Sequence, residues 1–388
     1  MHNTKSGRGE PFRSSSSSPV EAAVSDNPLL KDLVDEESVR TIAAALRESL
    51  PELDEEAFVK AVFDDEWANR PLKKRIRHIA VTIHSLLPDD YAKALDIVCS
   101  TAETMGQGGI AAWCFNDFVE EYGVEEPDLS LTALEQLTQL ASSEFAIRPF
   151  LQRYPGRVAE QMLEWAHHDS EHVRRLASEG FRPRLPWGLG VPALKKDPTP
   201  ILPVLEELRD DPSETVRRSV ANNLNDISKD HPEVVVSILR AWGAASSEAR
   251  ALRKHALRTL LKKGHPGALE LLGFSKDVSV SVVGLAVQPK SAAVGEHVYI
   301  EFEVVSAGRD VQPVMIDYAV TYQNLSGTGS RKVFKGVVDE LEPGQSTSLR
   351  RKVSLEPMST RRILVGPHVV EAQVNGVVHA AVEFDVVE

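Results

Sequence analysis

Cysteine is scarce in this sequence: Cys99 and Cys114 are the only two among 388 residues. Two cysteines cannot provide the disulfide framework of a small secreted domain, and these two are too far apart to form a Cys-x-x-Cys motif. Long apolar runs are also missing, because none approaches the roughly 20 residues that a membrane span requires. The first residues lack the apolar segment of a signal peptide. We therefore expect a cytoplasmic protein without a membrane anchor.

Positive charge is in short supply as well, since 44 lysines and arginines face 57 aspartates and glutamates, for a net charge of −13. Taken alone, this balance argues against a nucleic-acid binder, because phosphate binding needs clustered lysine and arginine. The charge is unevenly distributed, however. Residues 144–272 carry 20 basic and 17 acidic residues, so this segment is slightly basic within an acidic protein.

The length and the residue pattern indicate more than one domain. A single hydrophobic core stops growing at roughly 250–300 residues, and this chain has 388. Residues 1–26 are rich in serine and cannot bury enough apolar surface to fold, so we expect a disordered tail. Residues 27–274 show the three- and four-residue apolar spacing of helices almost throughout. Within them we predict helices over 71–87, 89–105 and 130–143, the last two with Asp89 and Ser130 as N-caps.

An internal repeat occupies the second half of this helical region. SEHVRRLAS (170–178) matches SETVRRSVA (213–221) 43 residues later, and residues 252–261 match 216–225 more loosely 36 residues later. Self-similarity at about 40 residues, each unit a helix pair, predicts an α-solenoid of HEAT-like repeats. Basic residues recur near the starts of the repeat helices and could form a stripe for a phosphate backbone, but the pattern alone favours solvated faces or salt bridges between repeats. They are Arg148, Arg174, Arg175, Arg217, Arg218, Arg253 and Lys254.

After Phe274 the pattern changes to short runs of alternating polarity separated by turn residues. Seven such runs in roughly 110 residues are typical of an immunoglobulin-like β-sandwich. We place the boundary near 275–277. The predicted fold class is therefore multidomain, α then β, with a repeat domain over 27–274 and a β-sandwich over 275–388.

The densest group of polar and aromatic residues lies in HVRRLASEGFRPRLPWG (172–188). Arg175 and Glu179 are four residues apart and share a helix face, and Gly180 ends that helix. Pro183 and Pro186 should then fix an extended segment. This segment would present Arg182, Arg184 and Trp187.

One repeat later, Asn222, Asn223 and Asp226 occupy the next helix, and Glu144 opens the repeat before. Three carboxylates on neighbouring helices could converge on the concave side. Each also has a structural interpretation. Glu144 could cap a helix, Glu179 could form a surface pair with Arg175, Asp226 and the asparagines could satisfy backbone groups between repeats, and Trp187 could belong to the core.

The sequence resembles the AlkC branch of the AlkD/AlkC DNA alkylation repair glycosylases, on the motifs SSEFAIRPF (142–150), HVRRLASEGFRPRLPWG (172–188) and VRRSVANNLNDISKDHP (216–232). The likeness spans 27–274, and the immunoglobulin-like domain matches one subtype. It implies that Glu144, Glu179 and Asp226 are the active-site carboxylates. It also implies that Trp187 packs against the lesion nucleotide and that Arg175 supports the site. Relatives have a small residue at the position of Phe181, so the local packing in this protein could differ from theirs.

The resemblance implies substrates such as 3-methyladenine and similar cationic N-alkylated bases in duplex DNA, excised without flipping the base from the stack. A cationic base leaves readily, so the difficulty lies at the sugar, which acquires oxocarbenium character that carboxylates stabilise. We expect monofunctional hydrolysis, with Asp226 orienting the water and Glu144 and Glu179 stabilising the charged sugar and base. The remaining expected substrate and DNA contacts are Arg148, Arg182, Arg184, Arg218, Asn222 and Asn223.

No cofactor and no metal are expected. His168 and His172 are at helical spacing and could bind a metal, but a third ligand at a suitable spacing is missing. The expected partner is double-stranded DNA carrying alkylated bases, bound by a monomer. The alternative functions are a non-catalytic repeat scaffold for DNA or protein, and a DNA-structure binder that has lost catalysis.

Overall fold

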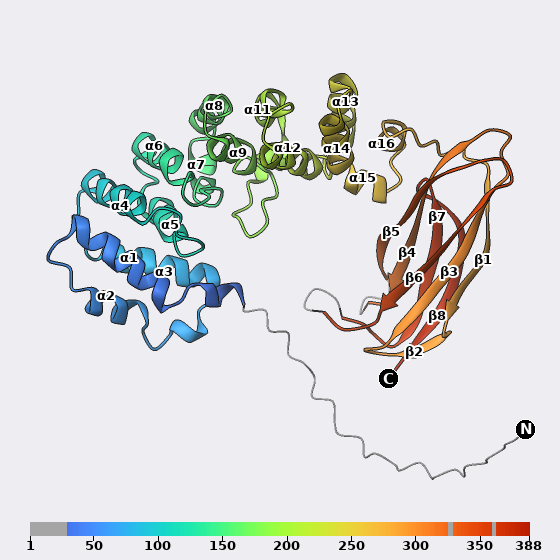
Figure 1. Cartoon of the computed structure of the whole chain (residues 1–388), viewed down its shortest axis with the longest axis horizontal. Coiled ribbons are helices and arrows are strands. Elements are labelled where there is room, and N and C mark those ends of the chain that lie inside the picture. The colour runs from blue at the N-terminus through green and yellow to red at the C-terminus, as the bar shows by residue number, and fades with distance from the viewer. Residues whose placement is uncertain (1–28, 325–328, 359–361) are drawn as a thin grey trace, which may run out of the picture.

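The computed structural model describes residues 29–324, 329–358 and 362–388, so the predicted tail over 1–26 lies outside the described residues. Helices occupy the chain from Leu30 to Glu270, and strands occupy it from Val280 to Val387. Figure 1 shows the helices following a curved arch, with the β-domain at its far end. The predicted order, a helical region followed by a β-domain, is the order in the structure. Among the described residues, none of the helices combines the length and apolarity needed to cross a membrane.

The arch consists of short helices joined by tight turns. In chain order it contains η1 (Leu30–Leu33), α1 (Glu36–Ser49), α2 (Glu55–Val62), η2 (Trp67–Asn69), α3 (Leu72–His84), α4 (Tyr91–Met105), α5 (Trp113–Tyr122), α6 (Pro127–Leu137), α7 (Arg148–Arg153), α8 (Pro155–Trp165), α9 (Glu171–Glu179), α10 (Pro192–Lys196), η3 (Thr199–Ile201), α11 (Leu202–Leu208), α12 (Glu214–Ile227), α13 (Pro232–Trp242), α14 (Ser247–Ala256), α15 (Arg258–Lys262) and α16 (Pro266–Glu270).

The internal repeat corresponds to successive helix pairs. Its matching segments lie on α9, α12 and α14, which pack side by side along the inner layer of the arch, while α8, α11 and α13 form the outer layer (Figure 1). In α12 the four-residue spacing of Val216, Val220 and Leu224 puts one apolar face in the core. Equivalent residues of successive repeats therefore line up along the inner surface.

Two predicted N-caps are wrong. Asp90, and not Asp89, caps α4 by accepting from the backbone N–H of Lys93. Ser130 is buried within α6, which begins at Pro127, and its hydroxyl contacts the hydroxyl of Tyr91 and the carbonyl oxygen of Gly123. Both errors are shifts of one to a few residues, the usual uncertainty when a helix start is inferred from polar residues.

The β-domain has eight strands in its described residues, where seven were predicted. They are β1 (Val280–Gln288), β2 (Ser291–Ala293), β3 (His297–Ser306), β4 (Gln312–Tyr322), β5 (Ser330–Leu341), β6 (Ser346–Ser354), β7 (Gly366–Val374) and β8 (Val377–Val387). The extra strand is β2, whose three residues pair in parallel with β8 and are too short to show alternation. One sheet has the order β1-β3-β6 and the other β2-β8-β7-β4-β5. Phe302, Val320 and Phe384 belong to the core of this domain.

The arch and the β-domain meet at a close backbone contact. Asn375, in the turn between β7 and β8, has a left-handed φ of 46°. Its backbone N–H donates to the carbonyl oxygen of Met315, its side-chain oxygen accepts from the N–H of Met315, and its side-chain amide donates to the carbonyl oxygen of Ser275. Gly376 then lies directly against Gly264 of the arch. One turn thus fastens β4, the linker and the last helices together.

Candidate active site on the inner helices

Two of the three predicted carboxylates share one buried cation. Arg182 contacts Oδ2 of Asp226 with Nε and Nη2, each at 2.8 Å, and donates from Nη1 to Oε1 of Glu179. The side chains of Glu179 and Asp226 are only 7% and 2% exposed. Because Glu179 ends α9 and Asp226 lies in the last turn of α12, the packing of these two helices brings the carboxylates together.

Further donors complete the hydrogen bonding of this pair. Ser219 Oγ lies 2.6 Å from Oε2 of Glu179, and Lys229 Nζ lies 2.8 Å from Oδ1 of Asp226. Burial alone would lower the pKa of Arg182, but the charges of Glu179 and Asp226 offset burial, and the pKa is raised. The guanidinium therefore stays charged between the two carboxylates. Lys229 differs from the other donors because its side chain is 37% exposed.

The third carboxylate pairs with the neighbouring arginine on α9. Arg175 Nη2 donates to Oε2 of Glu144 at 2.7 Å, and both groups contact the hydroxyl of Ser142 at 3.0 Å. Arg175 therefore pairs with Glu144, whereas Glu179 pairs with Arg182. The Arg175–Glu179 pair considered from the sequence does not form. The carboxylate of Glu144 also does not cap α7, whose N-cap residue is Ile147. Arg175 precedes Glu179 by one helical turn, which places the two groups on one face of α9.

The loop after α9 is held in place by the buried side chain of Arg148. Its guanidinium donates to the carbonyl oxygens of Gly180, Arg182 and Leu189. Arg148 is fully buried, and burial together with the charge of Arg182 lowers its pKa to about 10. In this structure neither Arg148 nor Arg182, which is 6% exposed, has surface to offer a DNA phosphate. Both instead organise the loop and the carboxylates.

Trp187 stands at the surface of that loop. It is 63% exposed, which excludes the core interpretation, and its φ of 63° is left-handed. Such a backbone conformation costs a bulky L-residue about 1–2 kcal/mol. The segment from Phe181 to Gly188 forms successive turns and not the predicted extended stretch. In Figure 1 the chain after α9 projects as a loop from the inner side of the arch, below α12.

The remaining predicted contact residues have specific partners. Arg184 pairs with Asp230 at 2.7 Å. Asn222 accepts at its side-chain oxygen from His255 and Arg258, while the buried amide of Asn223 donates to the carbonyl oxygen of Ser178. Asn223 matches the structural interpretation, because it satisfies a backbone group of the preceding repeat. Asn222 does not, because its partners are side chains. Phe181, the departure from the family pattern, is fully packed in the core.

The predicted basic stripe is only partly at the surface. The predicted position near a helix start holds for Arg174 and Arg217 but is wrong for Arg253, which lies in the last turn of α14. The first basic residue of each pair donates to backbone carbonyl oxygens: Arg174 and Arg217 to the turn before their own helix, and Arg253 to Leu239 and Leu271. The second basic residue is more accessible. Arg218 and Lys254 are exposed, and Arg175 is partly exposed. The inner surface therefore offers one accessible cation per repeat.

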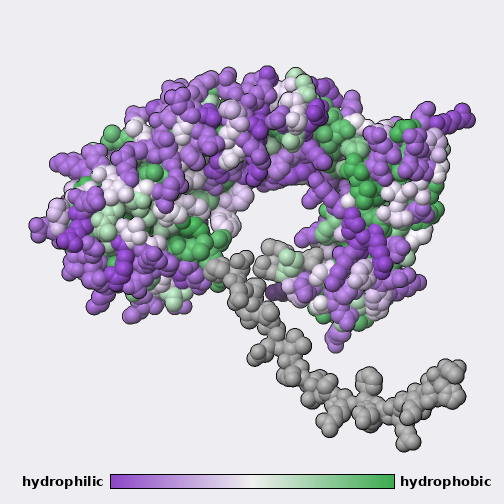
Figure 2. Space-filling model, in the orientation of Figure 1, coloured by the Kyte–Doolittle hydropathy of each residue, from purple (hydrophilic) through white to green (hydrophobic). Residues whose placement is uncertain are grey.

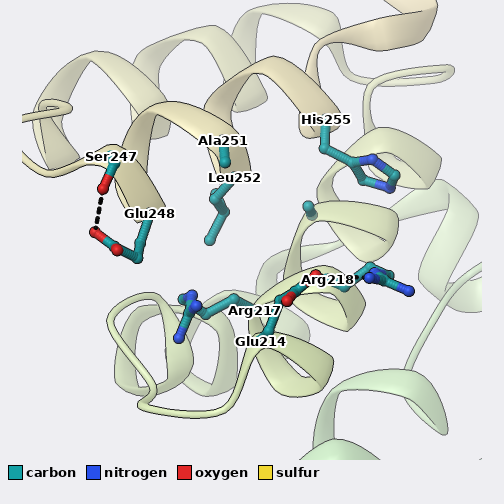
Figure 3. Close-up of a pocket in the computed structure, with 9 residues that line it drawn as sticks. Glu214, Arg217, Arg218, Ser247, Glu248, Ala251, Leu252 and His255 are labelled. Atoms are coloured by element: carbon teal, nitrogen blue, oxygen red, sulfur yellow. Dashed lines mark hydrogen bonds and ion pairs between the residues drawn. The ribbon is translucent and has the colours of Figure 1, made fainter.

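A hollow of about 470 Å³ lies between α12 and α14, one repeat beyond the carboxylates (Figure 3). Arg217, Arg218 and Glu214 line it from α12, and His255 and Glu248 line it from α14. Arg218 pairs with Glu214 at 2.6 Å. Burial, followed by the charges of Arg258 and Arg218, lowers the pKa of His255. None of the three predicted carboxylates lines this hollow.

Figure 2 shows an open space between the arch and the β-domain, with hydrophilic residues along much of its arch side. The site residues that sequence reasoning missed are Lys229 and Lys73. Lys73 Nζ, on α3, donates to the carbonyl oxygen of Trp187 at 3.2 Å. Lys229 follows Asp226 by three residues, a spacing that could have identified it, whereas Lys73 precedes Trp187 by 114 residues and no local signal links them.

In the described part of the chain, no group of three or more His, Cys, Asp or Glu side chains could hold a metal ion. The helical spacing assumed for His168 and His172 is also wrong. His168 lies before α9, in the turn, where its ring nitrogen accepts from the backbone N–H of Ser170. The described site offers fixed carboxylates, and the loop that carries Arg182 also carries the exposed ring of Trp187.

Comparison with known proteins gives matches over both parts of the chain. A family model described as DNA alkylation repair enzyme matches residues 138–260, and a model of the C-terminal Ig-like domain of the uncharacterised protein YhaZ matches residues 281–388. The uncharacterised protein YhaZ of Bacillus subtilis is 40% identical over 357 residues, covering 92% of this chain and 99% of YhaZ. Among solved structures, the Pseudomonas fluorescens alkylpurine DNA glycosylase AlkC, bound to DNA containing an abasic site analog, is 34% identical. It superimposes with a TM-score of 0.88 over 93% of this chain and 100% of that chain.

Proposed function

This chain belongs to the family of AlkC-type DNA alkylation repair enzymes, and from that premise we propose that it is a DNA glycosylase that hydrolyses the N-glycosidic bond of alkylated bases. The membership confirms the family predicted from the sequence motifs. The observation that carries the proposal is the buried pair of carboxylates, Glu179 and Asp226, joined by Arg182 in the loop that also presents Trp187. Buried charges of this kind are costly to maintain and are typical of functional sites.

The proposed substrates are cationic bases such as 3-methyladenine. A base alkylated at a ring nitrogen already carries positive charge and leaves without a general acid. The sugar then develops oxocarbenium character, and fixed carboxylates stabilise that charge more in the transition state than in the ground state. The exposed ring of Trp187 adds a cation-attracting face worth about 0.5–2 kcal/mol. The products are a free base and an abasic site.

The three carboxylates divide the work in this proposal. Glu144, whose side chain is the most exposed of the three at 15%, meets the sugar and base first. Glu179, which is paired with Arg182, contributes its negative charge to the site. Asp226 orients the attacking water, for which Lys229 must withdraw from Oδ1, and a DNA phosphate is a favourable destination for its ammonium. No step requires a cofactor.

The proposed DNA substrate is a duplex. The accessible cations Arg218 and Lys254 would bind its phosphate backbone. We also propose excision without base flipping, in which the exposed ring of Trp187 would contact a nucleotide that stays stacked. We propose that the enzyme acts as a monomer.

The deciding experiment measures free-base release from methylated duplex DNA by wild type, Asp226→Asn and the control Asp210→Asn. Asp226→Asn preserves shape and removes the charge, and we expect single-turnover release to fall by at least about a hundredfold. Asp210 is an exposed residue that pairs with Arg209, so its substitution should leave release unchanged.

If wild type binds DNA but releases no base, the protein is a non-catalytic repeat scaffold and the proposal fails. If wild type releases base and Asp226→Asn does so equally well, the activity stands and its assignment to these carboxylates is wrong. A fluorescent base analogue opposite or beside the lesion tests stacking, since a flipped nucleotide would raise its emission on binding.

A further inference from the structure

Trp187 is held in an unfavourable backbone conformation without support from core packing. Its φ is 63°, and 63% of the residue is exposed. A left-handed, exposed aromatic residue persists only where neighbouring groups fix the backbone on both sides. The contacts to the carbonyl groups of its loop therefore decide where the ring stands.

Two cations supply those contacts. Arg148 binds the carbonyl oxygens of Gly180, Arg182 and Leu189, on either side of Trp187. The carbonyl oxygen of Trp187 itself accepts from Lys73 Nζ at 3.2 Å. Lys73 lies in the first turn of α3, in a different part of the arch from α9. It is therefore the contact that ties the Trp187 peptide to a separate helix.

The same ammonium group also contacts the segment that carries Glu144. Lys73 Nζ lies 4.5 Å from the ring centroid of Phe145, the residue after Glu144. The Phe145 ring packs edge-on against Trp113 of α5, with centroids 5.5 Å apart. A cation over an aromatic face is an attractive contact that falls off with distance. One lysine thus joins the loop of Trp187 to the loop of Glu144.

We propose that Lys73 is a positioning residue that sets the placement of Trp187 relative to Glu144, and so shapes the site for a cationic nucleotide. This inference rests on the proposed glycosylase function. Lys73 acts through Trp187 and does not touch the reacting atoms. The competing explanation is that Lys73 binds a DNA phosphate directly, in which case its effect would be independent of Trp187.

A double-mutant cycle separates these two explanations. Lys73→Met keeps most of the length of the side chain and removes its charge, and Lys74→Met is the matched control at an exposed neighbour. We expect Lys73→Met to slow single-turnover base release about tenfold, as expected for a displaced substrate-contacting group. In a Trp187→Ala background the same change should cost less than about twofold. Lys73→Arg, which keeps the charge, should recover most of the rate.

Equal slowing by Lys73→Met in both backgrounds would overturn the inference and favour a direct phosphate contact. A full rate for Lys73→Met in the wild-type background would overturn it as well. Thermal unfolding of each variant separates loss of the fold from displacement of Trp187. The inference expects Lys73→Met to unfold at the same temperature as wild type.

A second readout does not depend on activity. Protein labelled with 5-fluorotryptophan gives one fluorine NMR resonance for each of its five tryptophans, and Trp187→Phe identifies the resonance of Trp187. We expect that resonance to shift or broaden in Lys73→Met and to stay unchanged in Lys74→Met. If it stays unchanged in Lys73→Met, the inference fails whatever the activity. If wild type releases no base but the resonance responds, the proposed function fails and the link between Lys73 and Trp187 stands.

Discussion

Arg182 reaches Asp226 across 44 residues with two nitrogen atoms, Nε and Nη2, each 2.8 Å from the same carboxylate oxygen. Its third nitrogen binds Glu179. Two carboxylates on adjacent helices would repel each other in a water-poor interior, where charges are screened weakly. The shared guanidinium removes that repulsion and holds α9 and α12 in register, so the charges that we propose for catalysis also form part of the packing.

Replacing Arg182 should therefore destabilise the fold strongly. Arg182→Met leaves two buried carboxylates without their shared counterion, and we expect the free energy of unfolding to fall by about 3–5 kcal/mol. Urea denaturation measures the change. Arg184→Met is the control, because it breaks a partly exposed pair with Asp230 and should cost less than about 1 kcal/mol. Equal losses in the two variants would mean that the buried arrangement adds nothing to stability.

The sequence predicted which carboxylates belong to neighbouring helices. The repeat makes the spacing of Glu179 and Asp226 readable, because equivalent positions of stacked helix pairs align. The order of the two domains was readable for a similar reason, since the apolar period changes from helical to alternating near residue 275.

The partner of each carboxylate was not predictable from the sequence. Helical spacing suggested Arg175 for Glu179, but Arg182 lies beyond the helix end, and the turns around Pro183 fold its guanidinium back between α9 and α12. Two prolines suggested an extended segment because each restricts its own φ, yet turns satisfy the same restriction. The contact of Lys73 with Trp187 depends on the curvature of the whole arch.

The β-domain contains a carboxyl group whose stability contribution depends on pH. Burial raises the pKa of Asp317, although the Gly336 backbone N–H and the charges of Lys335 and Lys262 act in the opposite direction. Because the folded pKa exceeds the unfolded one, the folded state binds more protons between the two values. Asp317 therefore imposes a penalty that is absent at low pH and complete above the folded pKa.

Asp317→Asn should remove that penalty while keeping an oxygen to accept from Gly336. We expect the variant to be more stable than wild type at pH 7, with the advantage disappearing as the pH falls toward 4. Urea denaturation across this pH range measures it, and the same change at the exposed Asp385 is the control. An advantage that is constant with pH would contradict the electrostatic explanation.

Both cysteines should be unreactive in the native protein. Burial raises the pKa of Cys99 to about 12 and also raises that of Cys114, which is fully buried. The thiolate is the reactive form, so we expect thiol reagents at pH 8 to label neither residue within the time in which denatured protein reacts at both. Rapid labelling of one thiol in the native state would locate a segment that opens without global unfolding.

The contact between Gly264 and Gly376 should be sensitive to a single added carbon atom. Both glycines have left-handed φ values, 66° and 75°, and a methyl group at Gly264 would lie 2.8 Å from the carbonyl oxygen of Gly376. Backbone on both sides cannot yield as a flexible side chain would. Gly264→Ala therefore carries two costs, the left-handed strain of about 1–2 kcal/mol and the displacement of the β-domain.

Gly243→Ala isolates the first cost, because Gly243 has a φ of 67° and no heavy atom within 4 Å of an added Cβ. We expect Gly264→Ala to lose more stability than Gly243→Ala in urea denaturation. Small-angle scattering should also show a changed separation of the arch and the β-domain in Gly264→Ala alone. Equal losses in the two variants, with identical scattering, would mean that the joint adapts to the methyl group and that backbone contact does not determine the angle between the domains.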